Sequence, residues 1–130
     1  MRRNKIYNEN CLETMARMKD NFLDLTVTSP PYDNLRTYNG YSFDFESIAK
    51  ELYRVTQEGG VVVWVVGDAT IKGSETGTSF RQALYFMECG FSLHDTMIYK
   101  KKRIVPLTHK RYEQSFEYMF VFVKAKIKAF

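Results

Sequence analysis

Apolar positions along the chain follow two spacings, one typical of strands and the other typical of helices. Short apolar runs predict strands, and apolar residues three or four positions apart predict one face of a helix. The predicted strands cover residues 5–8, 25–28, 61–66, 91–99 and 116–123. The predicted helices begin at Asn10, Asp44 and Ser79 and end near residues 20–21, 59–60 and 90. This alternation favours an α/β fold with a mainly parallel sheet.

Polar residues at the starts of the predicted helices support these assignments. Asn10 with Glu13, and Ser79 with Gln82, match the spacing of a capping box, in which each side chain satisfies a free backbone N–H. Asp44 can accept such a hydrogen bond before the second helix. The glycines at 59–60 and at 90 are typical of helix ends.

The strand at 61–66 is apolar at every position, which predicts burial on both of its faces. The last two strands, 91–99 and 116–123, are separated by a long basic stretch and predict a β-hairpin with a basic loop. Residues 33–43 contain asparagine and glycine and predict a loop.

Length and composition limit the class of protein. A chain of 130 residues with 45% hydrophobic and 15% aromatic residues can bury one modest core, so we expect a single domain over residues 1–130. The net charge of +4 fits a polyanionic partner but is common in proteins without one. The two cysteines, Cys11 and Cys89, match no metal or redox spacing. No apolar stretch approaches the ~20 residues that cross a bilayer. We therefore expect a reduced, cytoplasmic protein.

The tetrapeptide Ser29-Pro30-Pro31-Tyr32 follows the predicted strand 25–28 directly. Each proline ring fixes φ and removes an N–H, so the loop is stiff and presents carbonyl oxygens as acceptors. The Ser29 hydroxyl is another acceptor. Acceptors of this kind suit methyl transfer to an amine on a nucleic-acid base, because they draw lone-pair density back to the nitrogen. Tyr32 offers a face on which a flipped base can stack.

The sequence around this loop resembles the exocyclic-amine DNA methyltransferases, which carry a [DNS]PP[YFW] tetrapeptide. Segments 5–13, 59–68 and 116–124 also resemble family segments, in the order of the permuted branch. The resemblance implies S-adenosylmethionine as cofactor and adenine or cytosine in DNA as substrate, with a lean towards cytosine from the serine. It implies catalytic roles for Ser29, Pro30, Pro31 and Tyr32.

The resemblance also implies cofactor-binding residues. Asn10 stands where the family usually has an acidic residue that contacts adenosine. Cys11 would contribute only backbone, and Ser29 is a further expected contact of the cofactor. Helix capping accounts for Asn10 equally well. Asp68 follows a buried strand at the carboxyl edge where α/β sheets place ligands, although a plain turn has the same sequence.

Positive charge is concentrated in the loop of the predicted hairpin. Backbone phosphates of DNA would account for such a cluster, and a solvated basic loop is the alternative. The predicted nucleic-acid-binding residues are Lys100, Lys101, Lys102, Arg103, Lys110 and Arg111.

The family's glycine-rich FxGxG cofactor motif is not found in the sequence. None of the seven glycines forms a G-x-G pair that opens a helix. We therefore expect a three-layer, Rossmann-like methyltransferase sheet that is incomplete. The strand before Ser29 would then be a bare edge, which predicts self-association or pairing of residues 5–8 with residues 24–28. Two functions stay open: a methyltransferase half that needs a complementing chain with the FxGxG segment, or a non-catalytic module that binds nucleic acid or a partner.

Overall fold

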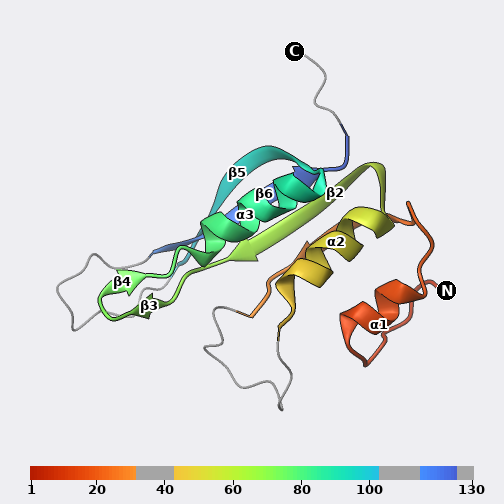
Figure 1. Ribbon diagram of the computed structural model, residues 1–130, viewed down its shortest axis with the longest axis horizontal. Coiled ribbons are helices and arrows are strands. Elements are labelled where there is room, and N and C mark those ends of the chain that lie inside the picture. Colours follow the sequence, from red (N-terminus) through yellow and green to blue (C-terminus); the bar gives the residue numbers. More distant parts are fainter. Residues whose placement is uncertain (32–42, 103–114, 126–130) are drawn as a thin grey trace.

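The computed structural model of the chain describes residues 1–31, 43–102 and 115–125 (Figure 1). Three helices and six strands occur in these parts of the chain. They are α1 Cys11–Ala16, β1 Leu23–Thr28, α2 Phe45–Val55, β2 Thr56–Val66, β3 Thr70–Ile71, β4 Ser74–Glu75, α3 Thr78–Cys89, β5 Ser92–Lys100 and β6 Phe116–Val123.

Four strands form one sheet in the order β1-β2-β6-β5, and β3 pairs with β4 in a separate two-stranded ribbon. β1 and β2 are parallel, while β6 runs antiparallel to both β2 and β5. The α/β class and the hairpin of β5 and β6 are therefore confirmed. The sheet is mixed rather than mainly parallel, because β6 turns back between β2 and β5.

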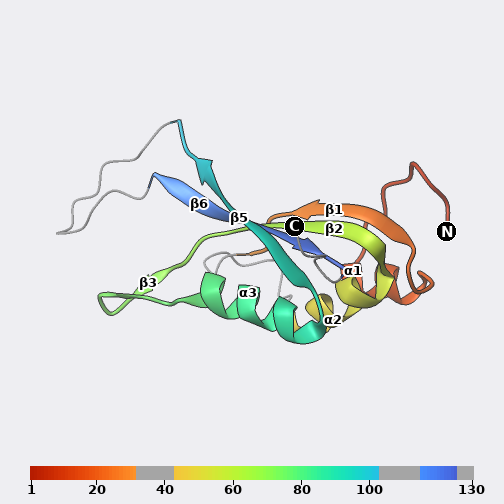
Figure 2. The same ribbon diagram turned by 90° about the horizontal axis from the view of Figure 1, so that it is seen from above.

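The helices of the described residues all lie on one face of the sheet (Figure 2). On this face β2 contributes Val62, Trp64 and Val66, which are buried, while Val61, Val63 and Val65 on the other face are less buried. Full burial on both faces of β2 is therefore not observed. The expected third layer is not formed by the residues described here.

The core is a cluster of aromatic rings between the sheet and the helices α2 and α3. Phe86 of α3 is fully buried, and its ring centroid lies 4.9 Å from that of Trp64 and 4.7 Å from that of Phe122. Phe91 also belongs to this cluster, and its ring centroid lies 5.8 Å from that of Phe86. These edge-on and tilted contacts are the geometry that aromatic pairs prefer, and they fix α3 on β2 and β6.

The strand predicted at residues 5–8 is not formed, and Ile6 is 93% exposed. The predicted pairing of this segment with residues 24–28 is also not formed, so β1 is an edge strand of the sheet. A strand needs a neighbour for its backbone groups. Within the described residues the segment has none, which explains why an apolar pattern alone was insufficient there.

The second helix ends earlier than predicted, and β2 begins immediately after Val55. The Thr56 hydroxyl donates to the carbonyl of Leu52 at 2.6 Å. The pairing of β2 with β1 begins at Thr56 and Leu23, is interrupted by a bulge, and resumes at Val61 and Leu25. Gly59 has φ +81°, and a Cβ at Gly60 would lie 3.1 Å from the carbonyl oxygen of Leu23. The two glycines therefore serve a bulge and a close backbone approach rather than a helix end.

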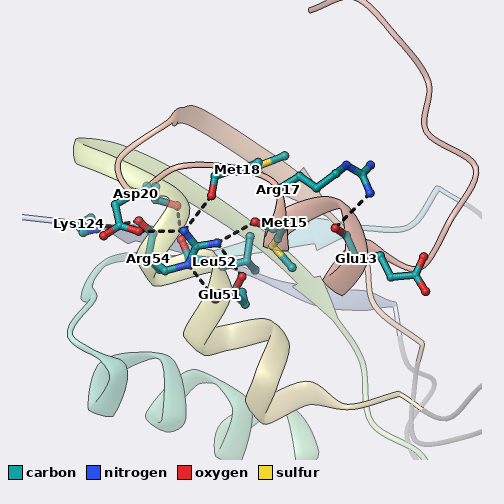
Figure 3. Close-up of polar contacts among 10 residues, drawn as sticks. Glu13, Met15, Arg17, Met18, Asp20, Glu51, Leu52, Arg54 and Lys124 are labelled. Carbon is teal, nitrogen blue, oxygen red and sulfur yellow. Dashed lines mark hydrogen bonds and ion pairs between the residues drawn. The ribbon is translucent and has the colours of Figure 1, made fainter. Parts of the chain in front are cut away.

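Arg54, in the last turn of α2, connects α2 to α1 and to the segment that follows it (Figure 3). Its guanidinium donates to the carbonyl oxygens of Met15 at 2.7 Å and Met18 at 2.9 Å, and it pairs with Asp20 and Glu51 at 2.8 Å each. The carboxylates of Glu51 and Asp20 raise the pKa of Arg54 above its ordinary value. One side chain thus bonds a carbonyl in the last turn of α1 and another in the segment that follows α1, and it ties both to α2.

Replacing Arg54 by methionine is expected to lower the free energy of unfolding by about 2–3 kcal/mol, because two carbonyls and Glu51 lose a charged donor. Urea unfolding monitored by circular dichroism measures this loss. Arg17→Met is the matched control, because 48% of the Arg17 side chain is exposed and its ion pair with Glu9 is expected to contribute much less to stability. Equal losses in both variants would contradict the role given to Arg54.

Candidate active site

A cavity of about 800 Å³ lies on the helix side of β1. Its walls come from the start of α1, from β1 and the residues after it, from α2, and from Trp64 of β2. Apolar side chains such as Leu12, Ile48 and Trp64 line it together with polar groups that include Asn10, Thr28, Ser29 and Asp44. Its size and mixed lining are those of a small-molecule site.

Ser29, Pro30 and Pro31 follow the carboxyl end of β1 and all line this cavity. Ser29 is exposed, Pro30 is buried and Pro31 is partly buried. The loop is therefore anchored by its first proline ring while the serine stays accessible at the cavity. Tyr32 lies outside the described residues.

Asn10 and Cys11 line the same cavity from the start of α1. The Asn10 side-chain oxygen accepts from the N–H of Leu12 at 2.9 Å, so Asn10 is the N-cap that the sequence predicted. Partial desolvation raises the pKa of the Cys11 thiol, which keeps it protonated at neutral pH. The structure thus places Asn10, Cys11 and Ser29 around one space, and their contacts with a cofactor stay a prediction.

Asp68 lies after β2 and is not among the residues that line the cavity. Its carboxylate accepts from the backbone N–H of Ser79 at 2.8 Å and from the hydroxyls of Ser79 and Thr76. Asp68 therefore caps the start of α3. The expected capping box is not formed, because Ser79 bonds to Asp68 and Gln82 is buried, where it accepts from Trp64 Nε1 at 2.9 Å.

Three residues of the predicted basic cluster are described by the structure, and they lie at the same end of the sheet as Ser29: Lys100, Lys101 and Lys102. Across the sheet, the paired residues are Thr28 of β1, Trp64 of β2, Phe120 of β6 and Thr96 of β5. Because β6 is antiparallel to both β2 and β5, β5 runs in the same direction as β1 and β2. The residues that follow β1, β2 and β5 therefore share one edge. Lys100 and Lys102 are exposed there, whereas Lys101 pairs with Glu117 at 3.2 Å. Arg103, Lys110 and Arg111 lie outside the described residues.

Two carboxylates at the cavity were not predicted as site residues. Glu9 lines the cavity and pairs with Arg17, whose hydrogen bonds lower the pKa of Glu9. Asp44 lines it from the start of α2, and hydrogen bonds from the Ser47 hydroxyl and backbone N–H lower the pKa of Asp44. The sequence marked Asp44 only as a helix cap, and a cap residue that also faces a cavity is visible only in three dimensions.

A family profile and individual relatives of known sequence all point to the same family of proteins. The sequence profile of the N6/N4 DNA methylase family matches residues 23–130. The orphan methyltransferase M.BamHII of Bacillus amyloliquefaciens is 70% identical over 115 residues, which cover 85% of this chain and 43% of that protein. The type II methyltransferase M.MthZI of Methanothermobacter thermautotrophicus is 29% identical over 131 residues, which cover 78% of this chain and 37% of that protein.

Solved structures share the fold. PvuII DNA methyltransferase, which is cytosine-N4-specific, superposes with a TM-score of 0.75 at 20% identity and covers 91% of this chain and 48% of its own. A putative DNA modification methylase from Thermus thermophilus, solved with S-adenosyl-L-methionine, has a TM-score of 0.68 at 22% identity. The matched region covers 92% of this chain and 54% of that protein.

The chain thus spans about half, or less, of the length of the relatives that it matches. The family profile nevertheless covers most of the chain, including β1 and the Ser29 loop. The resemblance inferred from the sequence is confirmed: the chain belongs to the N6/N4 DNA methylase family.

Proposed function

We propose that this chain is the amine-binding half of an S-adenosylmethionine-dependent DNA methyltransferase that acts on the exocyclic amine of cytosine or adenine. The observation that carries this proposal is the position of Ser29 to Pro31, at the carboxyl end of a parallel strand and on the wall of an 800 Å³ cavity. Ligands bind at this edge in open α/β sheets.

The chemistry assigned to the loop is hydrogen-bond acceptance. The amine of a flipped base donates its hydrogens to the Ser29 hydroxyl and to the Pro30 carbonyl, and this localises the lone pair on nitrogen. Tyr32 stacks on the base. The loop contributes fixed acceptors and positioning rather than a strong base.

The residues that line the cavity fit part of the proposed cofactor. The partly buried side chains of Leu12, Met18 and Phe43 offer an apolar wall for a purine ring, and the Asn10 amide offers a donor group beside it. Cys11 contributes backbone, and Asp68 stays a predicted contact from the neighbouring turn. When bound, S-adenosylmethionine supplies the methyl group from its sulfonium.

We further propose DNA as the substrate and the exposed Lys100 and Lys102, with their basic neighbours, as contacts to its phosphates. The complete active unit then includes a region equivalent to the part of the relatives that lies outside the segment that this chain matches. Among the described residues no helix has both the length and the apolar character to span a membrane. We place this reaction in the cytoplasm.

A reconstitution assay tests the function. The purified chain is mixed with the complementing fragment, defined as the part of M.BamHII outside the segment that this chain matches, and with unmethylated plasmid DNA and S-adenosylmethionine. Mass spectrometry of the digested DNA should then detect N4-methylcytosine or N6-methyladenine, and neither polypeptide alone should produce it. A stable mixture that binds DNA but forms no methylated base would favour the alternative, a non-catalytic binding module.

A further inference from the structure

A two-stranded ribbon, formed by β3 and β4, extends the chain beyond the end of β2 (Figure 1). The two strands pair antiparallel with Ile71 opposite Ser74, and Lys72 and Gly73 make the turn between them. The φ angle is 51° at Lys72 and 81° at Gly73, and two positive values are typical of a type I′ turn. Residues 70–75 are all exposed, so the ribbon is a projecting arm and not part of the core.

Hydrogen bonds hold the base of this ribbon, although its tip is exposed. The Thr76 N–H donates to the carbonyl of Ala69 at 2.9 Å, and Ala69 is buried. The Thr76 hydroxyl donates to Asp68 at 3.3 Å, and the same carboxylate accepts from the Ser79 N–H at 2.8 Å. The ribbon therefore projects in a defined direction from the junction between β2 and α3.

Two adjacent residues at the tip, Ile71 and Lys72, are not choices that the fold requires. Ile71 is 57% exposed, so it adds little to the core. Lys72 occupies the first position of the turn, where the left-handed backbone favours Asn, Asp or Gly and a lysine is strained. No carboxylate in the described parts of the chain forms an ion pair with Lys72. An apolar side chain beside an available positive charge indicates a contact surface.

The ribbon projects from the end of the sheet that carries Ser29. Because β2 is parallel to β1, the residues after both strands lie at one end of the sheet, where Lys100 and Lys102 also lie. Figures 1 and 2 both show the ribbon extending outward beyond this end. A base reaches Ser29 only after it leaves the helical stack, so the duplex that supplies the base must lie against the same end.

We propose that the ribbon of β3 and β4 enters the major groove of DNA beside the flipped nucleotide, where Ile71 packs against the neighbouring bases and Lys72 binds a backbone phosphate. The inference rests on the proposed function for the identity of the partner, DNA. The major groove is about 12 Å wide and admits a two-stranded ribbon. A lysine on a phosphate fixes the position of the duplex, and an apolar side chain pressed against the bases supports a locally unstacked step.

Fluorescence anisotropy of a labelled DNA duplex, titrated with the whole chain, tests this contact. Ile71→Ala should bind about tenfold more weakly, because most of an apolar contact is lost. Lys72→Asn removes the charge but retains a residue that suits the turn. It should therefore reduce the slope of log affinity against log salt concentration by about 1.

A duplex with glucosylated hydroxymethylcytosine tests which groove is used, because its sugars fill the major groove. Glucosylation should weaken binding of the unmodified chain more than binding of Ile71→Ala, since both changes remove the same contact. Equal weakening of the two proteins would overturn the assignment to the major groove.

Leu84→Ala and Lys19→Asn are the matched controls. Leu84 lies on α3, and its exposed fraction of 61% is close to the 57% of Ile71. Lys19 is exposed and precedes β1, at the opposite end of the sheet from Ser29. Both controls should keep the affinity and the salt dependence of the unmodified chain. Equal effects in the ribbon variants and the controls, or absence of duplex binding, would overturn the proposed contact.

Binding and methylation separate this inference from the proposed function. DNA binding that depends on Ile71 and Lys72, in a chain whose mixture with the complementing fragment forms no methylated base, would leave the ribbon contact standing and overturn the function. Methylation with the same DNA affinity in the ribbon variants and the controls would do the reverse.

Discussion

The Ser29→Ala variant is expected to methylate DNA about 100-fold more slowly than the unmodified chain when each is combined with the complementing fragment of M.BamHII. The substitution removes the hydroxyl that we propose as an acceptor for the amine hydrogens. Ser29 is exposed at the cavity, so the free energy of unfolding should change by less than about 1 kcal/mol. Single-turnover rates with saturating cofactor and DNA measure the effect on the chemical step.

Ser29→Thr is the control for this variant, because threonine retains a hydroxyl at the same position. It should recover a substantial part of the rate that alanine loses. A fast Ser29→Ala variant would refute the acceptor role, and a variant that loses its fold would assign Ser29 a structural role instead.

Trp64→Ala is expected to lower the free energy of unfolding by about 3–5 kcal/mol, the range of large-to-small changes of aromatic core residues. Trp64 is 1% exposed and contacts the rings of Phe45 and Phe86, with centroids 5.8 Å and 4.9 Å away. Its removal leaves a void between α2, α3 and β2 and leaves Gln82 without its indole donor. Such a loss is a large part of the ~5–15 kcal/mol that stabilises a typical domain.

Thermal and urea unfolding of three variants would separate these contributions. Trp64→Phe retains a ring but strands the buried Gln82 oxygen, so its loss should be smaller, about 1–3 kcal/mol. Ile71→Ala is the surface control, since Ile71 is 57% exposed, and it should change stability by less than about 0.5 kcal/mol. A Trp64→Ala loss below about 1 kcal/mol would show that the aromatic cluster does not hold the helices on the sheet.

Local patterns in the sequence predicted most of the elements correctly. The apolar positions of α2 and α3 recur every three or four residues, and the two arms of the hairpin are continuous strand-like segments. Both patterns lie within short stretches of sequence, so they are visible without tertiary information. The strand predicted at residues 5–8 failed for the opposite reason, because its existence depends on a neighbour. The end of α2 was misplaced because glycine has several uses, and a Cβ at Gly60 would crowd the backbone carbonyls of Gln57 and Leu23.

The candidate site was predictable only in part. The tetrapeptide at Ser29 was recognisable because its chemistry is carried by adjacent residues. Asp44 and Glu9 join the cavity from other elements, and no spacing in the sequence marks them. Asp68 was expected beside the ligand from its place after β2, but its capping contacts with Ser79 depend on how α3 returns to the sheet. Tyr32 stays a prediction.

The place of β6 between β2 and β5 has a consequence for biosynthesis. β6 follows every other described strand along the chain, so it leaves the ribosome after them. The unit of β1, α2 and β2 can assemble early, but β5 has no sheet to join until residues 116–123 have been made. During that interval β2 presents its inner edge to its surroundings, where it is open to wrong pairing. The nascent chain therefore depends on its last described strand to close the middle of its sheet.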